Sequence, residues 1–153
     1  KMNIQIIQVP YDSGHRNLRA GNGPEHLIRN GLAQALQNEG HEVFVETVES
    51  QAEFRAEVQT QFELYRSLAT RVAEARSNGK FPLILSGNCG ATLGAIAGKD
   101  IKRLGVVWFD AHGEFNTPET TTSGFLDGMG LAIAITAIAF VLPLKALLRI
   151  STP

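Results

Sequence analysis

The sequence predicts an α/β protein of three layers, with helices covering both faces of a parallel sheet. Apolar runs of strand length alternate with amphipathic helical stretches along the whole chain. The later runs are continuously apolar, which is typical of strands covered on both faces. Such sheets collect ligands beyond the carboxyl ends of their strands, so we expect the functional residues directly after those runs.

The first part of the chain is predicted to form two strands joined by a helix. Residues 4–9 and 42–48 are the strand-like runs. Pro24 suits the first position of a helix, where its missing N–H is not needed. Gly40 suits the end of that helix, so we expect a single helix between these two residues.

The second part is predicted to add a long helix, a short helix and two strands. The long helix is expected over 51–78 and the short one over 91–98, with strands at 81–86 and 104–109. One face of the long helix is apolar. That face consists of Phe54, Val58, Phe62, Tyr65, Leu68, Ala69 and Val72.

Composition narrows the class of protein. The chain has 153 residues, 44% of them hydrophobic, which suits one domain spanning 1–153. Fourteen Lys and Arg against fifteen Asp and Glu leave a formal charge of −1, so we expect no nucleic-acid partner. Cys89 is the only cysteine, which excludes an internal disulfide. No basic leader is followed by an apolar run at the N-terminus, so we expect a cytoplasmic protein.

The tail over 129–153 is unusually apolar, and no charged residue occurs between Gly128 and Leu144. A membrane-spanning helix needs about 20 apolar residues, and Pro143 interrupts this run, so we expect no membrane span. A helix over 128–143 is predicted instead. Its apolar side chains exceed what a soluble monomer exposes, so we expect a homo-oligomer, with a symmetric dimer that buries the tail.

Three residues with ligand chemistry follow the last predicted strand. Asp110, His112 and Glu114 alternate along the chain, so an extended backbone would point them the same way. Two carboxylates and an imidazole suit a divalent ion such as Mn²⁺ or Mg²⁺. The alternative is a polar loop whose charges are simply solvated.

A second candidate segment, 86–90, follows the preceding strand and opens a helix. Its glycines could cradle a phosphate, although the spacing lacks G-x-G-x-x-G and a Walker lysine. Cys89 could be a nucleophile or a ligand at the helix start, including a nucleophile paired with His112 in metal-free amidine hydrolysis. The remaining alternative is that Cys89 is a small buried hydrophobic residue.

The longer context of these motifs resembles a known family. Residues 108–118 (W-F-D-A-H-G-E-F-N-T-P) and 120–124 (T-T-T-S-G) are similar to the manganese-binding signature of the arginase, or ureohydrolase, family. That family includes arginase, agmatinase and formimidoylglutamase. Residues 85–94 resemble its Gly-Gly-Asp-His-Ser block, and 21–24 resemble a Gly-Pro turn near its N-terminus. The resemblance extends over about 3–133.

The resemblance implies an arginase-like fold and an enzyme that hydrolyses C–N bonds of linear amidines, with a guanidino or formimino compound as substrate. In the family, two Mn²⁺ ions activate a bridging water. Carried over by position, the metal ligands are Cys89, Asp110, His112 and Glu114. Asn116 and Ser123 correspond to residues that bind the amino-acid end of the substrate, and Asp127 to a residue that transfers protons.

Several positions depart from the family pattern. Cys89 stands where the family has a metal-binding histidine, and Asn88 where it has an aspartate. Phe125 and Asp127 replace an asparagine and a histidine. The family's later Asp-x-Asp pair has no counterpart, because no Asp follows Asp127. We therefore expect an incomplete fold holding one Mn²⁺ or none. The alternative function is a non-catalytic arginase-like module or fragment that acts through binding or self-association.

Overall fold

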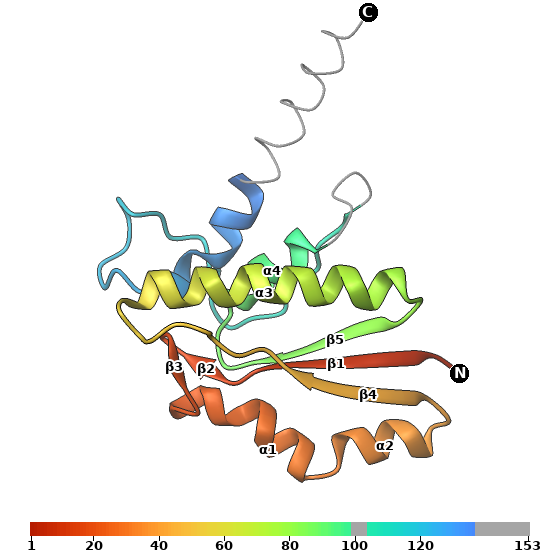
Figure 1. Ribbon diagram of the computed structural model, residues 1–153. Helices are drawn as coiled ribbons and strands as arrows, with labels where there is room; N and C mark the ends of the chain where they lie inside the picture. The colour runs from red at the N-terminus through yellow and green to blue at the C-terminus, as the bar shows by residue number, and fades with distance from the viewer. Residues whose placement is uncertain (99–103, 137–153) are drawn as a thin grey trace, which may run out of the picture.

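The computed structural model of the chain describes residues 1–98 and 104–136, arranged as helices on both faces of a parallel sheet (Figure 1). The strand order is β4-β1-β5, and the strands are β1 (Asn3–Val9), β4 (Glu42–Thr47) and β5 (Phe81–Ser86). Helices α1 (Gly23–Arg29) and α2 (Leu32–Asn38) lie on one face. Helices α3 (Glu57–Ser77) and α4 (Ala91–Ala97) lie on the other. The predicted three-layer α/β class is confirmed.

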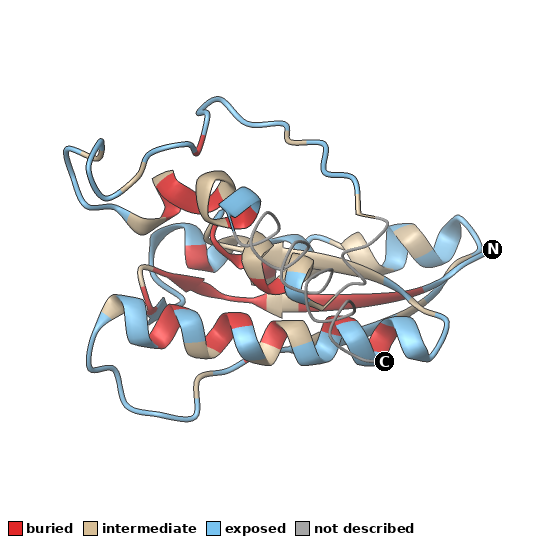
Figure 2. Cartoon of the chain, turned by 90° about the horizontal axis from the view of Figure 1, so that it is seen from above, coloured by how far each residue is buried: buried red, intermediate tan, exposed pale blue. Residues whose placement is uncertain are grey.

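Strand β1 is the centre of the core. It pairs in parallel with β4 on one side and β5 on the other. Ile6 and Ile7 are fully buried, on opposite faces of the pleated strand. Figure 2 shows buried residues concentrated in β1 and along one side of α3. The sheet is therefore covered on both faces at its middle strand, as the alternation of elements predicts.

The single helix predicted over 24–40 is two helices. Gly31 separates α1 from α2 with a φ of +89°, a left-handed conformation that glycine adopts without steric cost. Asn30 ends α1 before this break. The prediction followed the spacing of apolar residues, which continues across the break and does not reveal it.

Helix α3 begins six residues later than predicted, and its buried face agrees with the predicted one only at Tyr65, Leu68 and Val72. Ala56 is extended and precedes the first helical residue. Phe54, Val58 and Phe62 are 47%, 55% and 38% exposed, so the predicted apolar face was wrong at its N-terminal end. The buried residues of the helix are Thr60, Gln61, Leu64, Tyr65, Leu68, Val72 and Ala75. Gln61 is tolerated inside because its amide accepts a hydrogen bond from Tyr65 and donates one to Glu57.

The strand predicted over 104–109 is wrong. These residues pair with no strand among those the structure describes. Val107 and Phe109 are 80% and 94% exposed. A continuous apolar run becomes a buried strand only where it pairs with a neighbouring strand and is covered by other layers. Residues 104–109 do not pair with β5, the last strand of the described sheet, and most of them are exposed.

The remaining described elements surround the carboxyl ends of the strands. Strands β2 (Tyr11–Asp12) and β3 (His15–Arg16) form a small hairpin, followed by the 3-10 helix η1 (Arg19–Asn22). The 3-10 helix η3 (Leu126–Met129) leads into a helical stretch at 130–136. The rest of the predicted tail helix lies outside the described residues. Within those residues, every helix is too short or too polar to cross a bilayer.

Candidate metal site and adjoining hollow

The candidate site begins where β1 and β5 end side by side. The register aligns Val9 with Ser86, so the hairpin after β1 lies against the 87–90 turn after β5. Gly87 is at the point of closest approach, because a side chain there would collide with the backbone of Tyr11 and Gly21. Glycine is required at this position for the two segments to meet.

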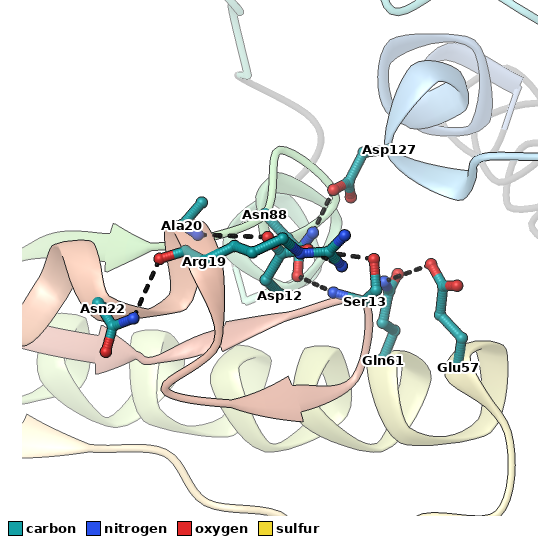
Figure 3. Close-up of polar contacts among 9 residues, drawn as sticks. All are labelled: Asp12, Ser13, Arg19, Ala20, Asn22, Glu57, Gln61, Asn88 and Asp127. Carbon is teal, nitrogen blue, oxygen red and sulfur yellow. Dashed lines mark hydrogen bonds and ion pairs between the residues drawn. The ribbon is translucent and has the colours of Figure 1, made fainter.

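Asn88 connects the hairpin to the segment that follows residue 104. Its Oδ1 accepts a hydrogen bond from the Ser13 backbone N–H at 3.2 Å, and its Nδ2 donates to Asp127 Oδ2. The Gly90 backbone N–H donates to Asp127 Oδ1 at 3.0 Å. Figure 3 shows Asn88 between the hairpin and Asp127. Asp127 is only 5% exposed, so its carboxylate is committed to this turn.

Three side chains with ligand chemistry converge beside this turn. Ligand atoms of Cys89, Asp110 and Glu114 all lie within 4.8 Å of one another. The Cys89 Sγ is 3.8 Å from Asp110 Oδ2. The carboxyl end of β5 therefore brings the thiol to the two carboxylates, which come from a segment far away in the sequence.

His112 lies at the rim of this trio. Its side chain is 82% exposed, with Nδ1 at 3.5 Å from Asp110 Oδ1 and 4.0 Å from Glu114 Oε1. The expected extended alternation is absent because the backbone turns: the His112 N–H donates to Asp110 Oδ1 at 2.9 Å, and Glu114 has a φ of +50°. His112 is thus more exposed than the other two side chains, although its Nδ1 still lies near both carboxylates.

Negative charge and burial shift the proton affinities of the trio. Burial, followed by the charge of Asp110, raises the pKa of Glu114. Burial and the Glu114, Asp127 and Asp110 carboxylates raise the pKa of the Cys89 thiol to about 11. The His112 backbone N–H instead lowers the pKa of Asp110. A divalent cation would reverse the first two shifts, since it favours the charged form of each ligand.

One carboxylate oxygen of the trio is buried without a hydrogen-bond partner among the described residues. The Glu114 side chain is 6% exposed, and Oε2 is buried with no hydrogen-bond partner in the part of the chain that the structure describes. A buried carboxylate oxygen without a partner is costly. A bound cation is one group that would satisfy it.

A hollow of about 460 Å³ adjoins the trio. The predicted substrate-binding residues Asn116 and Ser123 line it, together with His112 and Glu114. Phe125 lines it as well. The structure thus brings Asn116 and Ser123 to the same hollow, whereas Asp127 faces the 88–90 turn.

The sequence analysis did not identify Asp12, which stabilises the hairpin that contacts Asn88. Asp12 is 8% exposed and accepts hydrogen bonds from Ser13 Oγ, Arg19 and the Ala20 backbone, as Figure 3 shows. The D-S-G sequence at 12–14 signals a tight turn. No sequence signal indicates that this turn faces Asn88, because that depends on the register of β1 and β5.

Comparison with known proteins gives consistent results. The Arginase family profile matches residues 2–143. The arginase of Bacillus caldovelox is 33% identical over 144 residues, which is 86% of this chain and 48% of that protein. The crystal structure of Bacillus subtilis arginase superposes with a TM-score of 0.75 and 31% identity, covering 85% of this chain and 45% of that one. Entamoeba histolytica arginase, solved in complex with L-ornithine, gives a TM-score of 0.71 at 25% identity, covering 85% and 48%. The chain thus spans about half the length of these relatives.

Proposed function

Since the chain belongs to the arginase family, we propose that it provides the metal-binding edge of a hydrolase that cleaves C–N bonds in linear amidines. The observation that carries the proposal is the position of the Cys89, Asp110 and Glu114 trio beside a hollow lined by Asn116 and Ser123. The substrate class is a small guanidino or formimino compound. Its amino-acid end would bind Asn116 and Ser123, which agrees with a family member that binds L-ornithine.

The donor set supports a divalent ion, and Mn²⁺ is the ion that the family resemblance implies. Asp110 and Glu114 offer oxygen ligands of the kind Mn²⁺ prefers, and the orphaned Glu114 Oε2 fits a cation. The Cys89 thiol is a softer donor and would bind after losing its proton. His112, whose Nδ1 lies near Asp110, would be a fourth ligand. A bound ion would supply an acidified water and stabilise developing charge.

These four ligands suffice for one ion. We therefore propose a single-ion site for the described part of the chain. The family resemblance also predicts a proton-transfer role for Asp127. In the structure both oxygens of its carboxylate accept hydrogen bonds from the 88–90 turn.

The alternative function is a non-catalytic module that acts through self-association. Val107, Phe109 and Phe125 favour it, because they are 80%, 94% and 45% exposed and apolar surface of this kind promotes association. We propose a homo-oligomer in either case. The near-neutral charge supports the proposal that nucleic acid and anionic membranes are not partners. We also propose a cytoplasmic location.

The test is Mn²⁺-dependent product release by the purified chain. L-arginine, agmatine and N-formimino-L-glutamate are offered with and without Mn²⁺, and urea or formamide is measured. We expect release that requires Mn²⁺ and is lost in E114Q. The matched control E53Q changes an exposed glutamate and should retain activity. Mn²⁺ binding by calorimetry without any product would instead support the non-catalytic alternative.

A further inference from the structure

One buried carboxylate, that of Asp127, accepts hydrogen bonds from the residues before and after Cys89 in the sequence. Asn88 and Gly90 flank Cys89 in the sequence, and each donates a hydrogen bond to a different oxygen of Asp127. Asp127 belongs to η3, so the turn after β5 is fixed to a segment 39 residues away along the chain from Asn88.

The turn has no room to shift under this carboxylate. A Cβ at Gly90 would overlap Tyr65 Oη and lie 2.9 Å from Asp127 Oδ1. Tyr65 is itself fixed, because its hydroxyl donates to Gln61 Oε1 at 2.7 Å inside the core. Tyr65 and Asp127 therefore both pack against Gly90, the residue that follows Cys89.

The hydrogen bonds around Asn88 need an amide at 88 and a carboxylate at 127. The Asn88 Oδ1 accepts from the Ser13 N–H while its Nδ2 donates to Asp127. Asp127 accepts twice and donates nothing. An aspartate at 88 would place two carboxylates in contact, with the Asp12 charge also nearby. An asparagine at 127 would place an N–H₂ group against a donor.

We propose that Asn88 and Asp127 form a positioning pair that holds Cys89 at the metal-binding trio. This inference rests on the proposed metal site, and it makes Asp127 a residue that acts through the turn. The two departures from the family pattern at 88 and 127 then form one coupled change, because the side chains at these positions are hydrogen-bonded to each other.

The reciprocal double variant tests this coupling. In N88D/D127N the carboxylate introduced at position 88 accepts the Ser13 N–H and a hydrogen bond from the amide introduced at position 127. That amide still accepts the Gly90 N–H through its Oδ1. Every donor regains an acceptor and the net charge is unchanged. The hydrogen bond between positions 88 and 127 is therefore restored, with the donor now at 127 and the acceptor at 88. The single variants N88D and D127N each leave one contact mismatched.

Two measurements follow the position of Cys89 without using enzyme activity. Titration with Co²⁺ reports the thiolate–metal bond as a charge-transfer absorption band. Alkylation by iodoacetamide reports the accessibility of the thiol in the absence of metal. We expect N88D and D127N to weaken Co²⁺ binding about 10–100-fold, which is the usual cost of losing a residue that orients a ligand. The double variant should return to within about 3-fold of the parent chain, with the same band.

A matched control is N3D, which adds the same charge at an exposed asparagine and should bind Co²⁺ like the parent chain. The proposal would be overturned if the double variant bound Co²⁺ as weakly as N88D. It would also be overturned if the parent chain, both single variants and the double variant had equal Co²⁺ affinity and band intensity. If N88D does not fold, a folded double variant with the parent's Co²⁺ band is the expected rescue, and an unfolded one counts against it.

Failure of the metal site itself would give a different result. The parent chain would then bind Co²⁺ without a thiolate band, which contradicts a metal role for Cys89. Alkylation still tests the pair in that case. Faster alkylation in both single variants, reversed in the double variant, supports positioning by Asn88 and Asp127. Equal rates in all four proteins contradict it.

Discussion

The two segments that meet at the candidate metal site have very different surroundings. The 88–90 turn is attached to the sheet, and the polar atoms of Asn88 and the Gly90 N–H have partners from η3 and the β2–β3 hairpin. The 104–110 segment that leads to Asp110 is mostly exposed and pairs with no strand among the described residues. One side of the site is therefore held by the fold, whereas the other side depends on few contacts.

The difference indicates which ligands are preorganised. Glu114 is fixed, because its carbonyl accepts hydrogen bonds from the Leu131 and Ala132 backbone N–H groups. His112 is exposed at the rim. Local stability follows burial and hydrogen bonding, so we expect Cys89 and Glu114 to keep their positions without metal and His112 to gain its position on binding.

The largest expected effect comes from adding a side chain at Gly90, where the turn is closely packed. G90A places a methyl group against Tyr65 and Asp127, and we expect it to reduce the free energy of unfolding by about 2–3 kcal/mol. Denaturant unfolding followed by circular dichroism measures this change. G23A is the matched control, because a Cβ there meets nothing within 4 Å. A G90A chain as stable as G23A would show that the turn is not tightly packed.

The next effect separates the ligands by their chemistry. We expect C89S to abolish the thiolate band of Co²⁺ while lowering Mn²⁺ affinity less than D110N, since Mn²⁺ prefers oxygen ligands. A loss of about 10-fold or more in Mn²⁺ affinity is expected for D110N. Calorimetry on both variants and on the E53Q control measures this. Equal Mn²⁺ affinities for D110N and the parent chain would exclude Asp110 as a ligand.

A smaller effect concerns the pH dependence of Cys89. Its pKa is raised to about 11 by burial and by the Glu114, Asp127 and Asp110 carboxylates, so the reactive thiolate should keep increasing well above the ordinary cysteine value of about 8.5. The rate of iodoacetamide alkylation should therefore still rise between pH 9 and about 10. E114Q removes a negative charge that raises the pKa, so its profile should move to lower pH. A plateau near pH 9 in the parent chain would contradict this prediction.

The smallest expected effect lies on the exposed segment. Phe109 is 94% exposed, so F109S should change the free energy of unfolding of the monomer by no more than about 0.5 kcal/mol. It should nevertheless reduce self-association, because it removes apolar surface. Sedimentation velocity on F109S and the parent chain measures the second effect. A large loss of stability would mean that Phe109 is buried in solution.

The sequence predicted the fold well where local pattern and burial agree. The strands at 4–9, 42–48 and 81–86 match β1, β4 and β5 closely. Only β1 is buried on both faces, whereas β4 and β5 are partly exposed strands that pair with β1 on either side. The run at 104–109 has the same pattern, but Val107 and Phe109 have no covering layer in the described residues. Hydrophobicity reports a capacity for burial, and only the neighbouring layers decide whether burial occurs.

The candidate site was predictable in composition and less so in geometry. Cys89, Asp110 and Glu114 could be named from motifs, because each follows an apolar run at the expected edge of the sheet. The exposed position of His112 at the rim accompanies a backbone turn at Asp110, which the alternating pattern does not reveal. The contact between Asn88 and Asp127 arises from tertiary structure alone, so no local rule predicts it.

The central place of β1 constrains the order in which this protein can fold. Ile4 pairs with Val43 on one side and with Phe81 on the other, so β1 is synthesised before both of the strands with which it pairs. Closing such long loops before any strand pairing stabilises them is slow. During synthesis Ile6 and Ile7 remain without their layers until residues near Ser86 have emerged. This interval is when the nascent chain is most exposed to aggregation and most dependent on chaperones.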